Sequence, residues 1–345
     1  MSLTRLTWTL GVLASLLLGF SIYFLVEQEK VRGTDLPGGV LLEGLAENIT
    51  NVSQITLAGN GETTTLNHDG TSWKVAEKSG YPANASFVQG LLSGLKQSER
   101  LDPKTDKPKY LERLGLGERA VTITLMGEEN NILAVLTTGD QFLAPGGGGI
   151  ITFAWDERDQ RVWTVSSLPQ ISSNPAFWLR QEVIRLSTLR IKSVDIEVTG
   201  GPAWSVSKSS PEAQLFSLGA SGPEQVNQPN ARAIAYALAQ ILLLDVAQQD
   251  ELELFRVASA TYRTFDGLGV TLTFYEYEGE IWTTFEARYD ENVLLSDETS
   301  LVMMDAPPDG AAEAESMNAL WRGRAFLITV TKIAEILQSQ ETLRN

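Results

Sequence analysis

The feature that most constrains the fold is a set of short segments, found in both halves of the chain, in which polar and apolar residues alternate. "SQITLAG", from Ser53, and "KSVDIEVTG", from Lys192, show this alternation, which is typical of strands with one buried face. Two more strands around a turn follow each of them, in "TTTLNHDGTSWKVAE" and in "AWSVSKSSPEAQLFSLG". The pattern predicts antiparallel sheets, each with one apolar face that another element must cover.

An amphipathic helix is expected to supply that cover in each half. The segments "NASFVQGLLSGL" and "NARAIAYALAQIL" have the spacing of an apolar helix face. The residues on the two faces are Phe87, Val88, Leu91, Leu92 and Leu95 in the first segment, and Ala233, Ile234, Ala237, Leu238 and Ile241 in the second. Asn84 and Asn230 stand where N-caps belong, because a side-chain oxygen there accepts hydrogen bonds from free backbone N–H groups.

A further strand follows each expected helix. "AVTITL", residues 120–125, and "GVTLTF", residues 269–274, are interpreted as counterparts, and "NILAVLTTGD" and "GEIWTTFEARYD" follow them. The order of elements is the same in both halves, which favours a tandem duplication over a chance resemblance between strands. The expected fold class is α+β, with two tandem repeats of antiparallel sheet plus amphipathic helix at residues 51–190 and 191–345.

The chain begins with a long apolar run. Residues 6–26 contain 21 residues and no charge, and as a helix they span about 30 Å, the thickness of a bilayer's hydrocarbon core. A single uncleaved transmembrane helix is therefore expected, and a cleaved signal peptide is the alternative. The proposed anchor residues are Trp8, Leu18, Phe20 and Tyr23, with the two amphipathic rings near opposite ends.

The flanks of this run predict its orientation. Arg5 lies on the short leading side without any acid, so residues 1–5 are expected in the cytoplasm and the rest outside. Residues 27–50 are polar and are interpreted as a spacer between the membrane and the first repeat.

Composition restricts the possible activities. The net charge is −16, which disfavours nucleic acid as a partner and means that membrane attachment must be hydrophobic. The chain has no cysteine and one histidine, His68, so thiolate sites and multi-histidine metal sites are excluded. His68 stands beside an Asp-Gly pair and is interpreted as a turn residue. No cofactor, metal site or catalytic residue is expected.

Three further segments could carry a site. "APGGGG", residues 144–149, lacks the Gly-Lys-Ser/Thr of a phosphate loop and is interpreted as a hairpin loop. Residues 290–316 are acidic but lack the EF-hand pattern, so a solvated insertion is favoured over a calcium site. The aromatic segment between the repeats is expected to form their junction, as core packing or as a ligand platform, through Trp163, Phe177, Trp178 and Arg180.

Several stretches resemble the family catalogued as domain of unknown function 4340. They are "SGYPANASFVQGLLSGL", "RLGLGERAVTITL", "LTTGD", "VWTVSS", "NPAFWLRQEVIRLSTLRIKSVDIEV" and "NALWRGRAFLITVTKIAEIL". The resemblance covers roughly residues 50–338, and the second half departs from it, since no Tyr-Pro precedes its helix. It implies a bacterial envelope protein with one membrane anchor, and some members are encoded beside ABC-transporter permeases of the type associated with gliding motility.

Together these observations predict a non-enzymatic accessory or scaffolding subunit of a membrane protein complex, with an ABC transporter as the complex that the resemblance implies. The plasma membrane, or an internal bacterial membrane such as a thylakoid, would hold it, with the bulk in the periplasm or lumen. One alternative is a module that binds a small ligand, lipid or glycan in the groove between the repeats. Another is a hydrolase that uses carboxylates alone.

Overall fold

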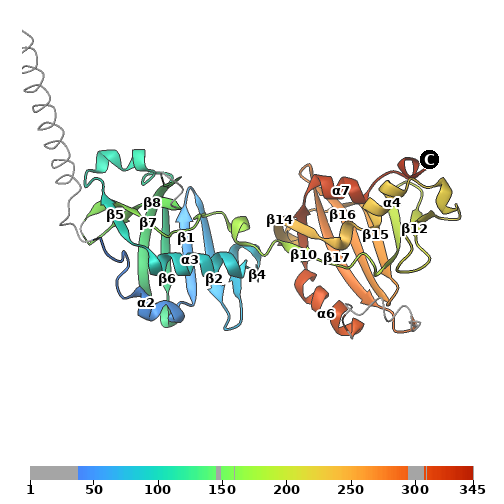
Figure 1. Ribbon diagram of the computed structural model, residues 1–345, viewed down its shortest axis with the longest axis horizontal. Coiled ribbons are helices and arrows are strands. Elements are labelled where there is room, and N and C mark those ends of the chain that lie inside the picture. The colour runs from blue at the N-terminus through green and yellow to red at the C-terminus, as the bar shows by residue number, and fades with distance from the viewer. Residues whose placement is uncertain (1–37, 145–148, 159, 294–306, 308, 345) are drawn as a thin grey trace, which may run out of the picture.

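The structure, a computed structural model, describes residues 38–144, 149–158, 160–293, 307 and 309–344. The expected transmembrane segment at residues 6–26 lies outside this described part. Within it, no helix has both the length and the apolar character needed to cross a bilayer. The described chain forms two units that lie side by side, each built on one antiparallel sheet (Figure 1). The α+β class is therefore confirmed.

The first unit is built on a sheet of nine described strands. Their order across the sheet is β4-β3-β2-β1-β6-β7-β8-β9-β5, and each paired neighbour is antiparallel. The strands are β1 (Gln54–Gly59), β2 (Glu62–His68), β3 (Trp73–Val75), β4 (Tyr81–Pro82), β5 (Arg100–Pro103), β6 (Val121–Met126), β7 (Ile132–Leu143), β8 (Ile150–Asp156) and β9 (Arg161–Val165).

Helix α3 (Ala85–Gln97) covers the apolar face of this sheet (Figure 1). Asn84 caps it as predicted, because its side chain accepts hydrogen bonds from the backbone N–H groups of Ser86 and Phe87. Val88, Leu91 and Leu95 are fully buried, whereas Phe87 is 40% exposed. Phe87 instead stacks on Phe177, with ring centroids 5.3 Å apart, so the predicted face is correct except at its first residue.

The first unit begins before residue 51. The backbone N–H of Leu41 donates to Ser98 O at 2.8 Å, and both Leu41 and Leu45 are buried in the core. Leu45 opens the short helix α2 (Leu45–Asn48). The C-terminal part of the expected spacer at residues 27–50 is thus packed, because its leucines complete the apolar face at the β5 side of the sheet.

The second unit is also built on nine described strands. Their order is β10-β14-β18-β17-β16-β15-β11-β12-β13. The strands are β10 (Glu182–Ile184), β11 (Ile191–Val198), β12 (Trp204–Ser207), β13 (Ser217–Leu218), β14 (Ile241–Gln248), β15 (Phe255–Thr264), β16 (Leu268–Tyr277), β17 (Glu280–Tyr289) and β18 (Arg324–Ile328). Since β10 belongs to this sheet, the second unit starts near residue 182 rather than at the expected residue 191.

The two sheets share one strand order. The run β3-β2-β1-β6-β7-β8-β9-β5 in the first matches β13-β12-β11-β15-β16-β17-β18-β14 in the second, strand for strand along the chain. "AVTITL" lies in β6 and "GVTLTF" lies in β16, but the counterpart of β6 by position is β15. The predicted match is therefore wrong by one strand, because neighbouring strands share the same two-residue alternation and only their pairing partners distinguish them.

The second covering helix is shorter than predicted. Helix α4 (Gln228–Ala235) is capped by Asn227, whose side chain accepts from the N–H of Asn230, so Asn230 is not the N-cap. Pro229 stands in the first turn, where its fixed φ suits a helix start. Ile241, expected on the helix face, opens β14 instead, because the apolar run after residue 240 pairs with β10 and β18.

Helices α6 and α7 also belong to the described part of this unit. Helix α7 (Val330–Ile336) contacts α4 over the same face of the sheet. Helix α6 (Gly310–Trp321) lies along β17, where the Asn318 side chain bonds both backbone groups of Ala287 at 2.8 Å. The expected acidic insertion at residues 290–316 thus ends in a capped helix, and its residues 294–306 and 308 lie outside the described part.

Candidate functional site

One extended segment, residues 178–184, joins the edges of the two sheets. Its first part lies beside β4: the N–H of Asn84 donates to Trp178 O at 2.7 Å, and the N–H of Arg180 donates to Pro82 O at 2.9 Å. Its second part is β10, which pairs with β14 of the second sheet. Backbone hydrogen bonds therefore connect the units edge to edge at the narrow waist of the molecule (Figure 1).

Aromatic side chains fill the space at this junction. Tyr81 of β4 and Phe326 of β18 are both fully buried, and their rings meet edge to face at 5.9 Å between centroids. Phe285 extends the cluster, 5.5 Å from Phe326. Trp178 is 1% exposed, and its indole N–H donates to Ser172 O at 2.9 Å. The junction is accordingly a packed core with an aromatic centre.

Charged groups also cross the junction. The Lys78 ammonium lies 2.6 Å from the Asp245 carboxylate of β14, with both side chains partly buried. The Arg324 guanidinium lies over the Tyr81 ring at 5.7 Å and donates to Ser79 O at 3.4 Å. Burial lowers the pKa of Arg324 and raises the pKa of Tyr81. These contacts connect residues of the two units that are far apart along the chain.

The residues predicted for the junction divide into two groups. Phe177 and Trp178 lie there, with rings 5.2 Å apart, and Arg180 contributes its backbone N–H while its side chain is exposed. Trp163 does not belong to the junction. It lies on β9, at the other end of the first sheet from β4, with the Arg100 guanidinium 5.6 Å from its ring. The prediction for Trp163 is wrong because it assumed that a residue close to Phe177 and Trp178 in the sequence is also close to them in space.

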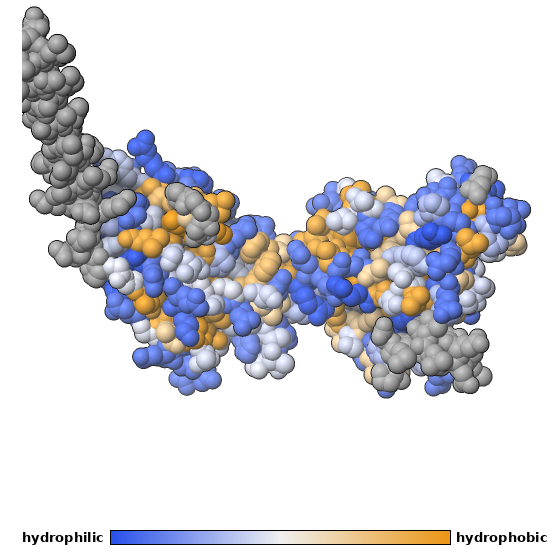
Figure 2. Space-filling view, in the orientation of Figure 1, coloured by the Kyte–Doolittle hydropathy of each residue, from blue (hydrophilic) through white to orange (hydrophobic). Residues whose placement is uncertain are grey.

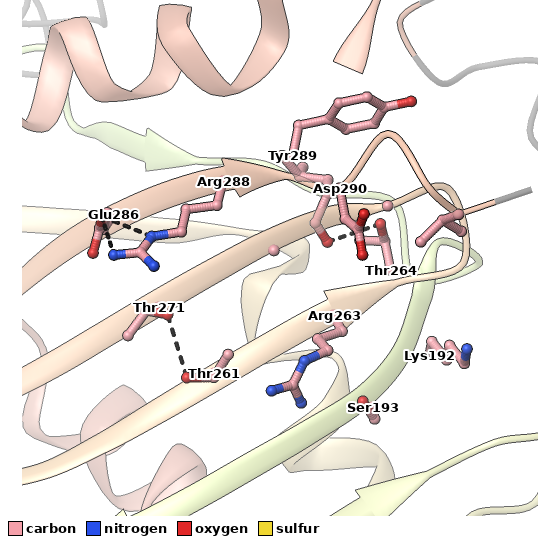
Figure 3. Close-up of a pocket in the computed structure, with 14 residues that line it drawn as sticks. Lys192, Ser193, Thr261, Arg263, Thr264, Thr271, Glu286, Arg288, Tyr289 and Asp290 are labelled. Atoms are coloured by element: carbon pink, nitrogen blue, oxygen red, sulfur yellow. Dashed lines mark hydrogen bonds and ion pairs between the residues drawn. The ribbon is translucent and has the colours of Figure 1, made fainter. Parts of the chain in front are cut away.

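A groove of about 840 Å³ lies elsewhere, on the second sheet. α4 covers one face of this sheet, where the Tyr262 hydroxyl donates to Ile234 O at 3.0 Å. Because side chains alternate along a strand, the neighbours Thr261 and Arg263 point to the opposite, open face. Figure 3 shows them beside Thr271 of β16, with Glu286 and Arg288 on the next strand, β17. The groove runs over the end of the sheet at the β15–β16 turn.

Paired charges and hydroxyl groups line this groove. Arg263 forms an ion pair with Asp195 of β11, and Arg288 forms one with Glu286 at 2.9 Å. The Thr261 and Thr271 hydroxyls lie 3.3 Å apart. The groove therefore offers positively charged donors, carboxylate acceptors and hydroxyl groups close together, which suits binding of a polar surface or a polyhydroxylated ligand.

Two other features of the groove bear on its chemistry. Hydrogen bonds from the Asn292 backbone and side chain lower the pKa of Asp290 at its rim, so this group is a carboxylate acceptor at neutral pH. In the described ranges, no group of three His, Asp or Glu side chains has the arrangement of a metal site.

One protein-family model matches a large part of this chain. The model described as "Domain of unknown function (DUF4340)" matches residues 73–259, which is more than half of the chain. The chain belongs to the DUF4340 family. No curated protein and no solved structure matches it.

The DUF4340 match runs from β3 into β15 and includes the whole junction segment 178–184. It also includes Lys192 and Ser193 of the groove lining, but it ends before Arg263 and Arg288, so most of the groove lies beyond it. The sequence of this DUF4340 protein did not predict the groove. Its threonines and arginines occupy solvent-facing positions of alternating strands, where such residues are common. The available signal was that outward positions of neighbouring strands carry opposite charges.

The remaining predicted segments have structural roles. His68 ends β2 before the turn at Asp69, and its ring lies 5.0 Å from that of Trp73. His68 is therefore the last strand residue before the turn, paired with Trp73, and it is not in the turn itself. β7 and β8 are antiparallel partners on either side of "APGGGG", which confirms a hairpin connection there, and residues 145–148 of that loop lie outside the described part.

Proposed function

We propose that this DUF4340 protein is a non-enzymatic, membrane-anchored accessory or scaffolding subunit of a membrane protein complex. The observation that carries the proposal is the edge-to-edge junction, which holds the two sheets in one extended body by backbone pairing and aromatic packing. Two units held at a fixed distance, with one polar sheet face open, could hold another protein in a defined position. The family resemblance supports an ABC transporter as the complex.

The apolar run at residues 6–26 supports a single membrane anchor, with residues 1–5 in the cytoplasm and the two units outside. The shared strand order supports the origin of the two units by tandem duplication. The groove on the second sheet supports protein contact, because its ion pairs can be exchanged for pairs with a partner's charges. We place the partner-binding surface there, rather than in the filled junction.

Affinity purification in mild detergent tests the proposal. The tagged full chain is compared with an Arg263→Glu/Arg288→Glu variant and with a control variant, Arg185→Glu, whose exposed arginine pairs with Glu182 away from the groove. We expect the same membrane proteins to co-purify with the wild type and the control, and to be lost from the groove variant. Recovery of the wild-type protein alone, as a monomer under several conditions, would refute a scaffolding role.

The groove also favours a second candidate function, an extracytoplasmic binding module for a polar ligand or glycan. Its volume of about 840 Å³ is in the range of small-molecule sites. The Arg263 and Arg288 pairs and the Thr261 hydroxyl match the hydroxyl groups of a sugar. A panel of soluble oligosaccharides tests this by thermal shift: a ligand should stabilise the wild type and not the Arg263→Glu/Arg288→Glu variant. The absence of any shift across the panel would remove this candidate.

A further inference from the structure

The β7–β8 hairpin ends in large apolar side chains that face solvent. Leu143 is 77% exposed and Phe142 is 40% exposed. Ile150 pairs with Leu143 across the hairpin, and the Phe153 ring lies tilted against the Phe142 ring, with 5.3 Å between ring centroids. Residues 141–144 and 149–154 carry no charge. Such a concentration of exposed apolar area at a hairpin end indicates a surface that is covered in the working protein.

This hairpin end lies at the same end of the first sheet as the start of the described chain. The N–H of Arg100 donates to Gly39 O at 3.0 Å. Arg100 pairs with Val165, Val165 with Thr152, and Thr152 with Gln141. These residues form one row across the sheet, and four strand spacings separate its ends by roughly 19 Å.

The surface near this row is apolar as well. Val40 and Leu101, beside the start of the described chain, are 41% and 42% exposed. In Figure 2 hydrophobic surface gathers on the first unit close to the point where the described chain begins. The described chain therefore begins at the same end of the sheet at which two separate segments expose apolar side chains.

The length of chain before residue 38 determines what can cover this surface. Residues 27–37 are 11 residues, which reach at most roughly 36–40 Å when extended. The uncharged run at residues 6–26 precedes them. If that run spans a bilayer, as the proposed function requires, the hairpin end is held within reach of the same bilayer surface.

We propose that the β7–β8 hairpin end is a second membrane contact, with Phe142 and Leu143 inserted at the boundary between the headgroups and acyl chains. This inference rests on the proposed membrane anchoring. An uncharged apolar end suits this boundary, and a protein of net charge −16 favours zwitterionic over anionic headgroups. Two contacts with one bilayer fix the direction in which the two units project, which a single point of attachment cannot do.

The absence of cysteine from the chain makes a direct test possible. The full chain carrying Leu143→Cys is labelled with an environment-sensitive nitrobenzoxadiazole dye and reconstituted in phosphatidylcholine vesicles with and without doxyl-labelled lipid. The matched control is Leu215→Cys, because Leu215 is 52% exposed on the second unit. A second site, Phe142→Cys, guards against a local effect of the label.

We expect the label at position 143 to be quenched by doxyl lipid at least about twofold more than the label at position 215, with a blue-shifted emission. Position 142 should behave like position 143. If the chain floats with the vesicles but positions 142 and 143 are quenched no more than position 215, the hairpin contact is refuted and the anchor stands. If the chain does not float with the vesicles, the anchor and the contact both fall.

Discussion

Replacement of Trp178 should separate the unfolding of the two units. Trp178 is 1% exposed at the junction, and a buried tryptophan replaced by alanine loses about 3–5 kcal/mol of unfolding free energy. Trp178→Phe keeps most of the apolar contact but loses the indole hydrogen bond to Ser172 O, so it should cost about 1–2 kcal/mol. Comparison of Trp178→Ala with Trp178→Phe therefore distinguishes the loss of packing from the loss of the hydrogen bond.

Trp163→Ala is the matched control for this experiment. Trp163 is 2% exposed, so its replacement should cost a similar amount of free energy, about 3–5 kcal/mol. It lies at the other end of the first sheet, however, so this variant should destabilise the first unit without loosening the junction.

Differential scanning calorimetry of the full chain in detergent provides the assay, with urea unfolding as the second measurement. We expect Trp178→Ala to divide the unfolding into two transitions more clearly than Trp163→Ala does. The reasoning would be refuted if Trp178→Ala cost less than about 1 kcal/mol, or if both alanine variants changed the shape of the transition equally.

Three further predictions concern the charged groups. A double-mutant cycle of Lys78→Ala and Asp245→Ala should give a coupling of about 1 kcal/mol that weakens with salt, measured by urea unfolding; zero coupling would contradict a tight pair across the junction. Hydrogen bonds from Arg158 outweigh burial and lower the pKa of Asp156, so its stabilisation is present above the unfolded pKa of about 3.9 and is lost as pH falls through the folded pKa. In thermal melts between about pH 2 and 6, the melting temperature of Asp156→Asn should thus fall less steeply with decreasing pH than that of the wild type. An unchanged slope of melting temperature against pH would disprove the assignment. Glu313→Gln removes one of two carboxylates that hold buried Arg190 and should cost about 3 kcal/mol in unfolding free energy, whereas a loss below about 1 kcal/mol would show that this network is not stabilising.

Much of the architecture could be predicted from the sequence because its signals are local. The alternation of polar and apolar residues predicted antiparallel strands in both halves, and Asn84 predicted the start of α3. The second helix was placed less well, since "NARAIAYALAQIL" continues with apolar residues into β14 and the helical spacing does not show where the helix ends. Asn227 and Asn230 were equally good caps by residue type, and only Pro229 between them favours the earlier one.

What the sequence could not predict depends on contacts between distant segments. Strand β6 resembles β16, yet it corresponds to β15. Neither segment shows by its own residues that β6 pairs with β1 and that β15 pairs with β11. The junction needs Tyr81 and Phe326, which lie far apart along the chain and meet only when the sheets are aligned edge to edge. The groove needs outward residues from several strands, and each of these residues is unremarkable by itself.

The most direct test of the account is the distance between the two units in the full chain. Spin labels on Lys96→Cys in α3 and Ala334→Cys in α7 place one exposed probe on a helix of each unit. Double electron–electron resonance in detergent and in nanodiscs should give one narrow distance distribution that agrees with the edge-to-edge arrangement. A broad distribution, or several separate distances, would contradict the fixed junction on which the proposed scaffolding role depends.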